Sequence, residues 1–379
     1  MKLSILQENL KNGLNITSRV AGKSLTLPIL NNIDFKVEKN FLQISATDLE
    51  VGIRWWSLAK VEKEGEIIAP AQLLTNLIPL LPNKVINLKV DNKVLFIECE
   101  NYKTQIKGFD PQEFPILPQV GGGEELSIDN NIFCQALSQV ADIAAQNQTR
   151  PEISGIYLKL QKDCLRLAAT DSFRLGEKTI PLKEKNKNTL ADKEVSLIFP
   201  QKTAREIINI LKEREGDLNI YFAPNHILFE IPMIETPHPQ IQIVSRLIEG
   251  EYPAYQDIIP KKYETQVSCQ RNDFLAQIKT ASLFSGKTNE IKFKVDPKKN
   301  EVNISSKDPD LGEHEASLVG KVKGKNVEIS FNHKFLVDGI LNIKSSEILL
   351  EFNGEEGPAV LRPVGDPSYI YLVMPIKAS

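Results

Sequence analysis

The sequence predicts an α+β fold in which three similar units follow one another along 379 residues. The first observation is an alternating apolar strand that runs into a turn with an aspartate, and it occurs three times. The copies read LQISATDLEVGIR at 42–54, LRLAATDSFRLGE at 165–177 and VNISSKDPDLGEH at 302–314. The second is the excess of strands over helices, arranged as successive hairpins, which favours α+β over an alternating α/β pattern.

Each unit is expected to contain two helices. The first is amphipathic and leads into a strand, at 6–20, 129–146 and 271–284. The second follows a β-rich run and a Pro or Asn, at 65–82, 195–213 and 327–345. The glycine run at 119–125 and the segment IEGEYP at 248–253 suit connections between units. We therefore predict domains at 1–123, 124–249 and 250–379.

Composition predicts a soluble globular protein, since 41% of the residues are hydrophobic and 25% are charged. Four scattered cysteines without a CxxC pair suit a reducing cytoplasm, and neither a membrane-spanning run nor a signal peptide is expected. The net charge is −3. Lys and Arg nevertheless outnumber Asp and Glu in the predicted helices, so we expect a helical face that attracts phosphates and an acidic remainder.

Motifs for catalysis or metal binding are weak. AGKS (21–24) and SGKT (285–288) resemble the end of a P-loop, but they lack its first glycine and follow predicted helices, which favours helix C-termini. The four histidines have no metal-ligand spacing, and KDPDLGEHE (307–315) is best interpreted as a solvated acidic turn. We therefore expect no catalytic residue, no metal and no cofactor.

The segment AATDSFRL (168–175) crowds Thr170, Asp171, Ser172 and Arg174 together like part of an active site. Its aspartate recurs as Asp48 and Asp308, and a catalytic group would not need three copies. We predict that these aspartates accept hydrogen bonds from backbone amides of their turns. The part peculiar to the second unit, SFRL, is where a function can be added to the scaffold.

Several motifs resemble those of the bacterial DNA polymerase sliding clamps, the β subunits of the replicase. They are LTLPILNNI (25–33), ATDLE (46–50), TDSFRL (170–175), EYPAY (251–255) and YLVMPI (371–376), in the family's order across essentially the whole chain. The resemblance implies three clamp domains, each with two helices packed on antiparallel sheets, and a head-to-tail homodimer that closes into a ring. Such a ring would hold double-stranded DNA topologically and without sequence preference, and would itself be non-catalytic.

The resemblance also implies a peptide-binding cleft between the second and third domains. Its residues are Ile153, Thr170, Ser172, Arg174, Leu175, Pro253, Ile258, Ile348, Leu372, Val373, Met374, Pro375 and Ile376. An apolar groove of this kind takes the aromatic and aliphatic anchors of short linear peptides, here from polymerase, clamp loader and repair proteins. The sequence departs from the family at Phe173, where His is common, at Asp257, where a basic residue is frequent, and in its extended tail (377–379).

Two further sets of residues follow from the resemblance. Lys23, Ser24, Arg150 and Lys202 are expected to contact DNA. Thr104 and Ile106 of one copy are expected to face Leu283 and Phe284 of the other across the dimer interface.

Two alternatives stay open. An enzyme of DNA metabolism would need carboxylates clustered around two metals, and the only candidate cluster lies at 308–315. A protein-binding scaffold that never encloses DNA is the other.

Overall fold

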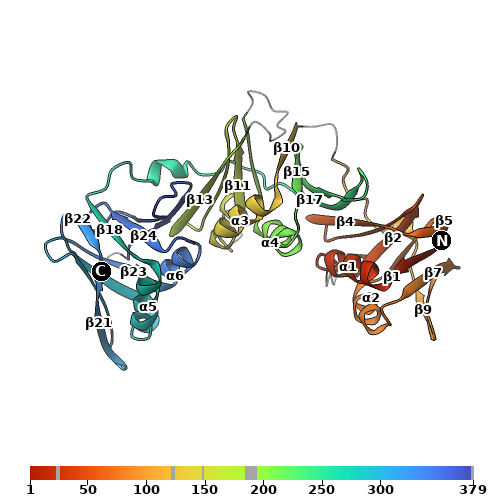
Figure 1. Ribbon diagram of the computed structural model, residues 1–379, viewed down its shortest axis with the longest axis horizontal. Coiled ribbons are helices and arrows are strands. Elements are labelled where there is room, and N and C mark those ends of the chain that lie inside the picture. The colour runs from red at the N-terminus through yellow and green to blue at the C-terminus, as the bar shows by residue number, and fades with distance from the viewer. Residues whose placement is uncertain (23–25, 121–123, 147–148, 184–193, 377–379) are drawn as a thin grey trace. The chain divides into compact units, whose positions relative to one another are not determined.

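The computed structural model describes residues 1–22, 26–120, 124–146, 149–183 and 194–376 (Figure 1). Within these ranges the chain forms six α-helices, two from each predicted repeat. They are α1 (Gln7–Thr17), α2 (Ala71–Leu77), α3 (Asn130–Val140), α4 (Gln201–Leu211), α5 (Arg271–Ser282) and α6 (His333–Leu341). Over the described ranges, the helices are too short or too polar to span a bilayer.

Two antiparallel sheets form a first compact unit, which holds residues 1–134 and 202–247. The five-stranded sheet has the order β5 (Lys60–Lys63), β1 (Lys2–Leu6), β7 (Val85–Asp91), β8 (Val94–Cys99), β9 (Tyr102–Lys107). The eight-stranded sheet has the order β10 (Glu124–Asp129), β15 (Asp217–Phe222), β16 (His226–Pro232), β17 (Pro239–Arg246), β4 (Val51–Leu58), β3 (Phe41–Thr47), β2 (Asn32–Glu38), β6 (Gly65–Pro70).

A second compact unit holds residues 135–182, 194–201 and those from 248 onward. Its nine-stranded sheet has the order β14 (Val195–Pro200), β11 (Gly155–Leu160), β12 (Cys164–Thr170), β13 (Arg174–Pro181), β26 (Tyr369–Val373), β25 (Ala359–Pro363), β24 (Glu347–Phe352), β18 (Thr265–Gln270), β22 (Lys321–Gly324). Its four-stranded sheet has the order β21 (Gly312–Val319), β20 (Glu301–Asp308), β19 (Glu290–Asp296), β23 (Val327–Asn332).

Neighbouring repeats share a sheet. β4 of the first repeat pairs with β17 of the second, and β13 of the second pairs with β26 of the third, both antiparallel. The central repeat thereby contributes strands to both compact units. Such ladders satisfy the backbone groups that an isolated repeat would expose at its sheet edges.

The cores follow from the strand and helix periodicities in the sequence. Val302 and Ile304 of β20 are buried at alternate positions, and α5 buries Phe274, Ile278 and Ala281 along one face. Helices also approach the sheets closely. A Cβ on Gly13 of α1 would lie 2.4 Å from the ring of Trp55 in β4, so only glycine allows this packing distance.

Candidate functional site

The turn between β12 and β13 is closed by the two residues that precede its tip. Asp171 Oδ1 accepts hydrogen bonds from the amides of Phe173 (3.0 Å) and Arg174 (2.9 Å). Thr170 Oγ1 donates to the carbonyl of Arg174 (2.7 Å) and accepts from the amide of Ser172 (3.1 Å). Ser172 adopts a φ of 78°, a left-handed conformation that these bonds stabilise.

The other two aspartate turns use the same bonds. Asp48 Oδ1 accepts from the amides of Glu50 (3.0 Å) and Val51 (2.8 Å), and Leu49 has a φ of 77°. Asp308 Oδ1 accepts from the amides of Asp310 (2.8 Å) and Leu311 (3.0 Å). The prediction that the repeated aspartates bond backbone amides of their turns is therefore confirmed.

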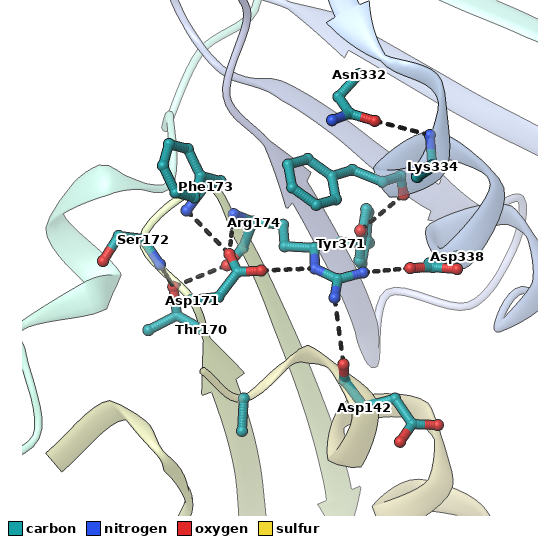
Figure 2. A network of polar contacts seen from close by, with 12 residues as sticks. Asp142, Thr170, Asp171, Ser172, Phe173, Arg174, Asn332, Lys334, Asp338 and Tyr371 are labelled. Carbon is teal, nitrogen blue, oxygen red and sulfur yellow. Dashed lines mark hydrogen bonds and ion pairs between the residues drawn. The ribbon is translucent and has the colours of Figure 1, made fainter. Parts of the chain in front are cut away.

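The side chain of Arg174 makes polar contacts beyond its own turn (Figure 2). Its Nε lies 2.9 Å from Asp171 Oδ2, its Nη1 pairs with Asp338 of α6, and its Nη2 donates to the carbonyl of Asp142 (3.3 Å). The guanidinium also lies over the Phe335 ring, 4.9 Å from the centroid. One side chain thus ties the β12–β13 turn to the 3-10 turn that follows α3 (Ala141–Ile143) and to α6.

The side chain of Arg174 is only 13% exposed. Burial alone would lower the pKa of the guanidinium, but Tyr371 and Asp171 outweigh it, and the net pKa lies above its usual range. All three guanidinium nitrogens have partners within the chain, so this residue holds the junction of the second and third repeats together.

An aromatic pair borders this network. Phe173 is exposed at the tip of the turn and stacks on Phe335, with ring centroids 6.3 Å apart. The carbonyl of Phe173 accepts a hydrogen bond from the amide of Met374 (2.8 Å), directly after β26 ends. Met374 itself is 36% exposed. The end of β26 and the turn therefore form one continuous surface.

The opposite side of the β13–β26 ladder carries an apolar cluster. Leu175 and Leu372 lie directly opposite each other and are buried with Ala168, Tyr255 and Val360. The segment from Tyr252 to Tyr263 packs across them, and Tyr255 donates from its hydroxyl to Glu177 Oε2 (2.6 Å). Burial first, and the carboxylate of Glu177 second, raise the pKa of Tyr255 well above its usual range.

The residues expected to line the peptide cleft all belong to the second compact unit, but their side chains differ in burial. Ser172, Ile258 and Met374 are exposed. Arg174, Pro253, Pro375 and Ile376 are half-buried, whereas Ile153, Thr170, Leu175, Ile348, Leu372 and Val373 are buried. The exposed members can contact a ligand directly, and the buried apolar members support them.

Three neighbours of this surface were missed at the sequence level: Tyr255, Phe335 and Asp338. A signal for the last two was available, since they lie three residues apart at the start of a helix that follows the capping residue Asn332. Residues at this spacing share a helix face, which here is the face turned toward Arg174.

The residues expected to contact DNA have partners of their own where they are described. Arg150 Nε lies 3.0 Å from Glu152 Oε1, and its Nη1 donates to Ser172 Oγ (3.3 Å). Lys202 Nζ pairs with Asp48. Lys23 and Ser24 lie outside the described residues.

The residues expected at the dimer interface lie next to two sheet edges. Thr104 and Ile106 lie on β9, the last strand of the five-stranded sheet. Leu283 directly follows α5 and is exposed, and Phe284 stacks on His314 of the edge strand β21 with ring centroids 5.8 Å apart.

No metal or P-loop chemistry is supported over the described ranges. No group of three His, Cys, Asp or Glu side chains among those residues could hold a metal ion. The SGKT segment forms a short 3-10 turn after α5, and Gly286 has a φ of 57°. A P-loop requires a strand before and a helix after the motif, so the interpretation as a helix C-terminus holds for this segment.

Three family models match the chain in succession. They are the DNA polymerase III beta subunit N-terminal domain (residues 1–118), central domain (127–254) and C-terminal domain (256–377). A curated relative from Synechocystis, named beta sliding clamp, is 29% identical over the whole of this chain and 99% of its own length. The beta sliding clamp of Staphylococcus epidermidis is 27% identical over the same shares.

Solved structures agree in fold. A putative DNA polymerase III beta subunit from Eubacterium rectale has a TM-score of 0.91 and 25% identity, and the DNA polymerase sliding clamp from Bacillus subtilis has 0.92 and 23%; each comparison covers all of both chains. The repeated aspartate turns, the shared sheets and the consecutive family matches lead to one conclusion: this chain belongs to the DNA polymerase III beta subunit family, the bacterial sliding clamps, and is a non-catalytic processivity factor.

Proposed function

We propose that this chain closes with a second copy into a cytoplasmic ring around duplex DNA, and that it tethers polymerase, clamp loader and repair proteins by their short linear peptides. The observation that carries the tethering role is the β13–β26 junction. There Met374 is exposed directly after β26, and Ile258 is exposed in the segment that packs on the buried apolar cluster. Arg174 fixes the framework of this junction. Peptide anchors need such pre-organised apolar surfaces.

The junction between the first and second repeats differs from the β13–β26 junction, which supports one peptide groove in each chain, at the second junction. Its ladder places Gly52 opposite Val244, where the second junction has Leu175 opposite Leu372. A Cβ on Gly52 would lie 1.9 Å from Leu117, so Leu117 already fills this space. Arg246 stands where the second junction has Met374. The first junction therefore differs from the second, because Leu117 covers its own apolar cluster with Leu228 and Val244, and a charged side chain replaces the methionine.

The ion pairs of the expected DNA-contact residues suit weak, mobile binding. Lys202 is paired with Asp48 and Arg150 with Glu152, so a phosphate would have to displace an existing partner. Such exchange costs little at an exposed site and leaves no sequence preference. A ring that holds DNA topologically needs no more than this.

The test is topological retention. The chain is loaded by a clamp loader with ATP onto nicked circular duplex DNA, and the DNA is then separated by gel filtration before and after linearisation. We expect retention on the circle and release from the linear form, because a ring slides off free ends. Equal retention on both forms would instead support a scaffold that does not encircle DNA.

The enzyme alternative is addressed in the same assay. Asp308→Asn combined with Asp310→Asn should leave retention on DNA unchanged. Both carboxylates belong to an exposed turn, and an asparagine oxygen can accept the same hydrogen bonds from the backbone amides of the turn. A DNA-modifying activity that disappears in this variant would overturn the non-catalytic assignment.

A further inference from the structure

The segment that follows the first repeat, residues 114–120, is buried with a period of three residues; we call it the first linker. Phe114 and Val120 pack against an apolar cluster that contains Leu117. Between these positions, Ile116 is 96% exposed, and both side chains at 118–119 are exposed. Three residues per turn is the repeat of a polyproline II helix, so the first linker turns one face of such a helix inward.

The sequence of the first linker favours this conformation. The stretch FPILP at 114–118 contains two prolines, and a proline disfavours the helical region for the residue before it. Phe114 accordingly has a φ of −84° and a ψ of 137°, which is close to polyproline II. Among the described residues 115–120, no backbone hydrogen bond joins one to another. The carbonyls of a polyproline II segment are therefore free to accept bonds from other parts of the chain.

The surface beneath the first linker is shaped by β4 and β17. A Cβ on Gly52 would lie 1.9 Å from Leu117 and 3.0 Å from Val244, so this glycine leaves the space that the leucine fills. Two residues farther along β4, Arg54 Nη2 donates to the carbonyls of Leu117 (2.6 Å) and Pro118 (3.0 Å). The first linker is thus held by a side-chain pocket and by its own backbone.

This surface suits an uncharged, proline-rich ligand. Arg54 Nη1 donates to Gln242 Oε1 (3.3 Å), so the hydrogen-bond partners of Arg54 are neutral oxygens, and burial lowers the pKa of its guanidinium. Tyr221 of β15 adds an aromatic ring to the apolar cluster. Proteins that bind polyproline II peptides use aromatic-lined surfaces of this kind, because the ligand is already ordered before it binds. We call Gly52, Arg54, Tyr221 and Val244 the linker-binding surface.

The segment that connects the second and third repeats is held in another way. Glu177 occupies on β13 the position that Arg54 occupies on β4, and it accepts a hydrogen bond from the hydroxyl of Tyr255. There the chain folds on itself, since the amide of Tyr255 donates to the carbonyl of Pro253 (2.6 Å) and Tyr255–Ile258 form a 3-10 turn. The first linker, in contrast, is bound as an extended peptide would be.

We propose that the linker-binding surface of the first junction is a site for proline-rich peptides, and that this chain's own linker is its resident ligand. A free peptide with apolar anchors at three-residue intervals would displace the linker from β4 and β17. A tethered ligand competes at an effective concentration on the order of 1 mM. The site is therefore filled in the resting chain, and the peptide cleft expected at the second junction stays the open one.

The probe is a fluorescein-labelled peptide with the sequence QEFPILPQV, residues 112–120, added to the full-length chain. Phe114→Ser combined with Leu117→Ser weakens the resident ligand and leaves the linker-binding surface unchanged. We expect this double variant to bind the probe about tenfold or more tightly than the unmodified chain, because the tethered competitor is lost. Ile116→Ser, at an exposed position of the same linker, is the matched control and should bind as weakly as the unmodified chain.

Two further variants locate the probe on the chain. Gly52→Ala, added to the double variant, should remove the gain in affinity, because the new Cβ takes the space of the leucine anchor. Met374→Ala, added instead, should leave the affinity unchanged, because Met374 lies at the second junction. Affinity lost with Met374→Ala and kept with Gly52→Ala would place the probe in the other cleft and overturn the proposal.

A second measurement detects displacement directly and does not depend on the double variant. Leu117→Cys places a thiol at a position that is 8% exposed, and the four native cysteines are buried. A saturating amount of the probe should raise the rate of thiol labelling about fivefold or more, because it holds the linker in its open state. A probe with serine in place of its leucine should not raise the rate. If the double variant does not fold, this measurement alone decides: a labelling rate that the probe leaves unchanged would overturn the proposal.

Discussion

Asp34 is a carboxyl group in an unusual place, because it is buried on β2 and only one of its oxygens has a partner. Ser45 Oγ donates to Oδ2 (2.9 Å), and Oδ1 is buried without a hydrogen bond. Desolvation first, and the nearby Glu66 second, raise the pKa of Asp34 from 3.8 to about 7. Between about pH 4 and 7, the folded protein therefore keeps a proton on Asp34 that the unfolded chain releases.

Asp34→Asn should change how stability depends on pH. Between pH 4 and 7 the folded state of the unmodified chain holds more protons than the unfolded state, so its stability falls as pH rises. A neutral amide removes this loss. We expect the variant to be more stable by roughly 2–4 kcal/mol at pH 8 and about equal at pH 4.

Urea unfolding followed by tryptophan fluorescence measures this effect, because Trp55 and Trp56 both lie on β4 of the same sheet. Asp310→Asn, the same substitution at an exposed position of the other compact unit, serves as the control for the change of side chain. A difference between Asp34→Asn and the unmodified chain that does not vary with pH would contradict the assigned proton.

At the scale of elements, the β12–β13 turn and α6 depend on one another through Arg174. Arg174→Ala would leave Asp171 Oδ2 and the carbonyl of Asp142 without their donor, and the Phe335 ring without its cation. We expect a loss of roughly 2–3 kcal/mol in the stability of this junction. Arg174→Lys should recover only part of it, because an ammonium cannot reproduce the planar fork.

Amide hydrogen exchange localises this prediction. Protection should fall in β13 and β26, which form one ladder, and stay unchanged in β19 and β20 of the other sheet. Asp338→Asn is the milder comparison, since Asp338 is half-exposed and loses charge but keeps an acceptor oxygen. Unchanged protection of β13 in Arg174→Ala would show that the guanidinium does not hold the junction.

The same elements show what the sequence could predict. The aspartate turns, the helix pairs and the three-repeat order were all predictable, because each depends on contacts a few residues apart. The pairing of β13 with β26 was not, since it joins Leu175 to Leu372 and no local pattern specifies a partner so distant in the chain. Likewise the motif TDSFRL predicts a functional role for Arg174. Whether its guanidinium faces a ligand or α6 depends on residues of another repeat, which the motif does not contain.

At the scale of the whole molecule, peptide tethering and ring closure should be separable, because they are assigned to different residues. Met374→Ala and Ile258→Ala each truncate an exposed apolar residue of the expected peptide cleft without opening a buried core. We expect each to weaken binding of a fluorescent peptide with leucine and phenylalanine anchors by about tenfold.

Ile116→Ala is the matched control, because it truncates a 96% exposed isoleucine in the linker of the first junction, where Leu117 already fills the space beside Gly52. Peptide anisotropy and sedimentation are measured on the same samples. Peptide affinity should fall in the first two variants only. The dimer should persist in all three, since none of the substituted residues belongs to the expected dimer interface on β9 and after α5. Dissociation of the Met374→Ala dimer would mean that the end of β26 belongs to the dimer interface. An equal loss of peptide affinity in Ile116→Ala would mean that the groove lies at the first junction.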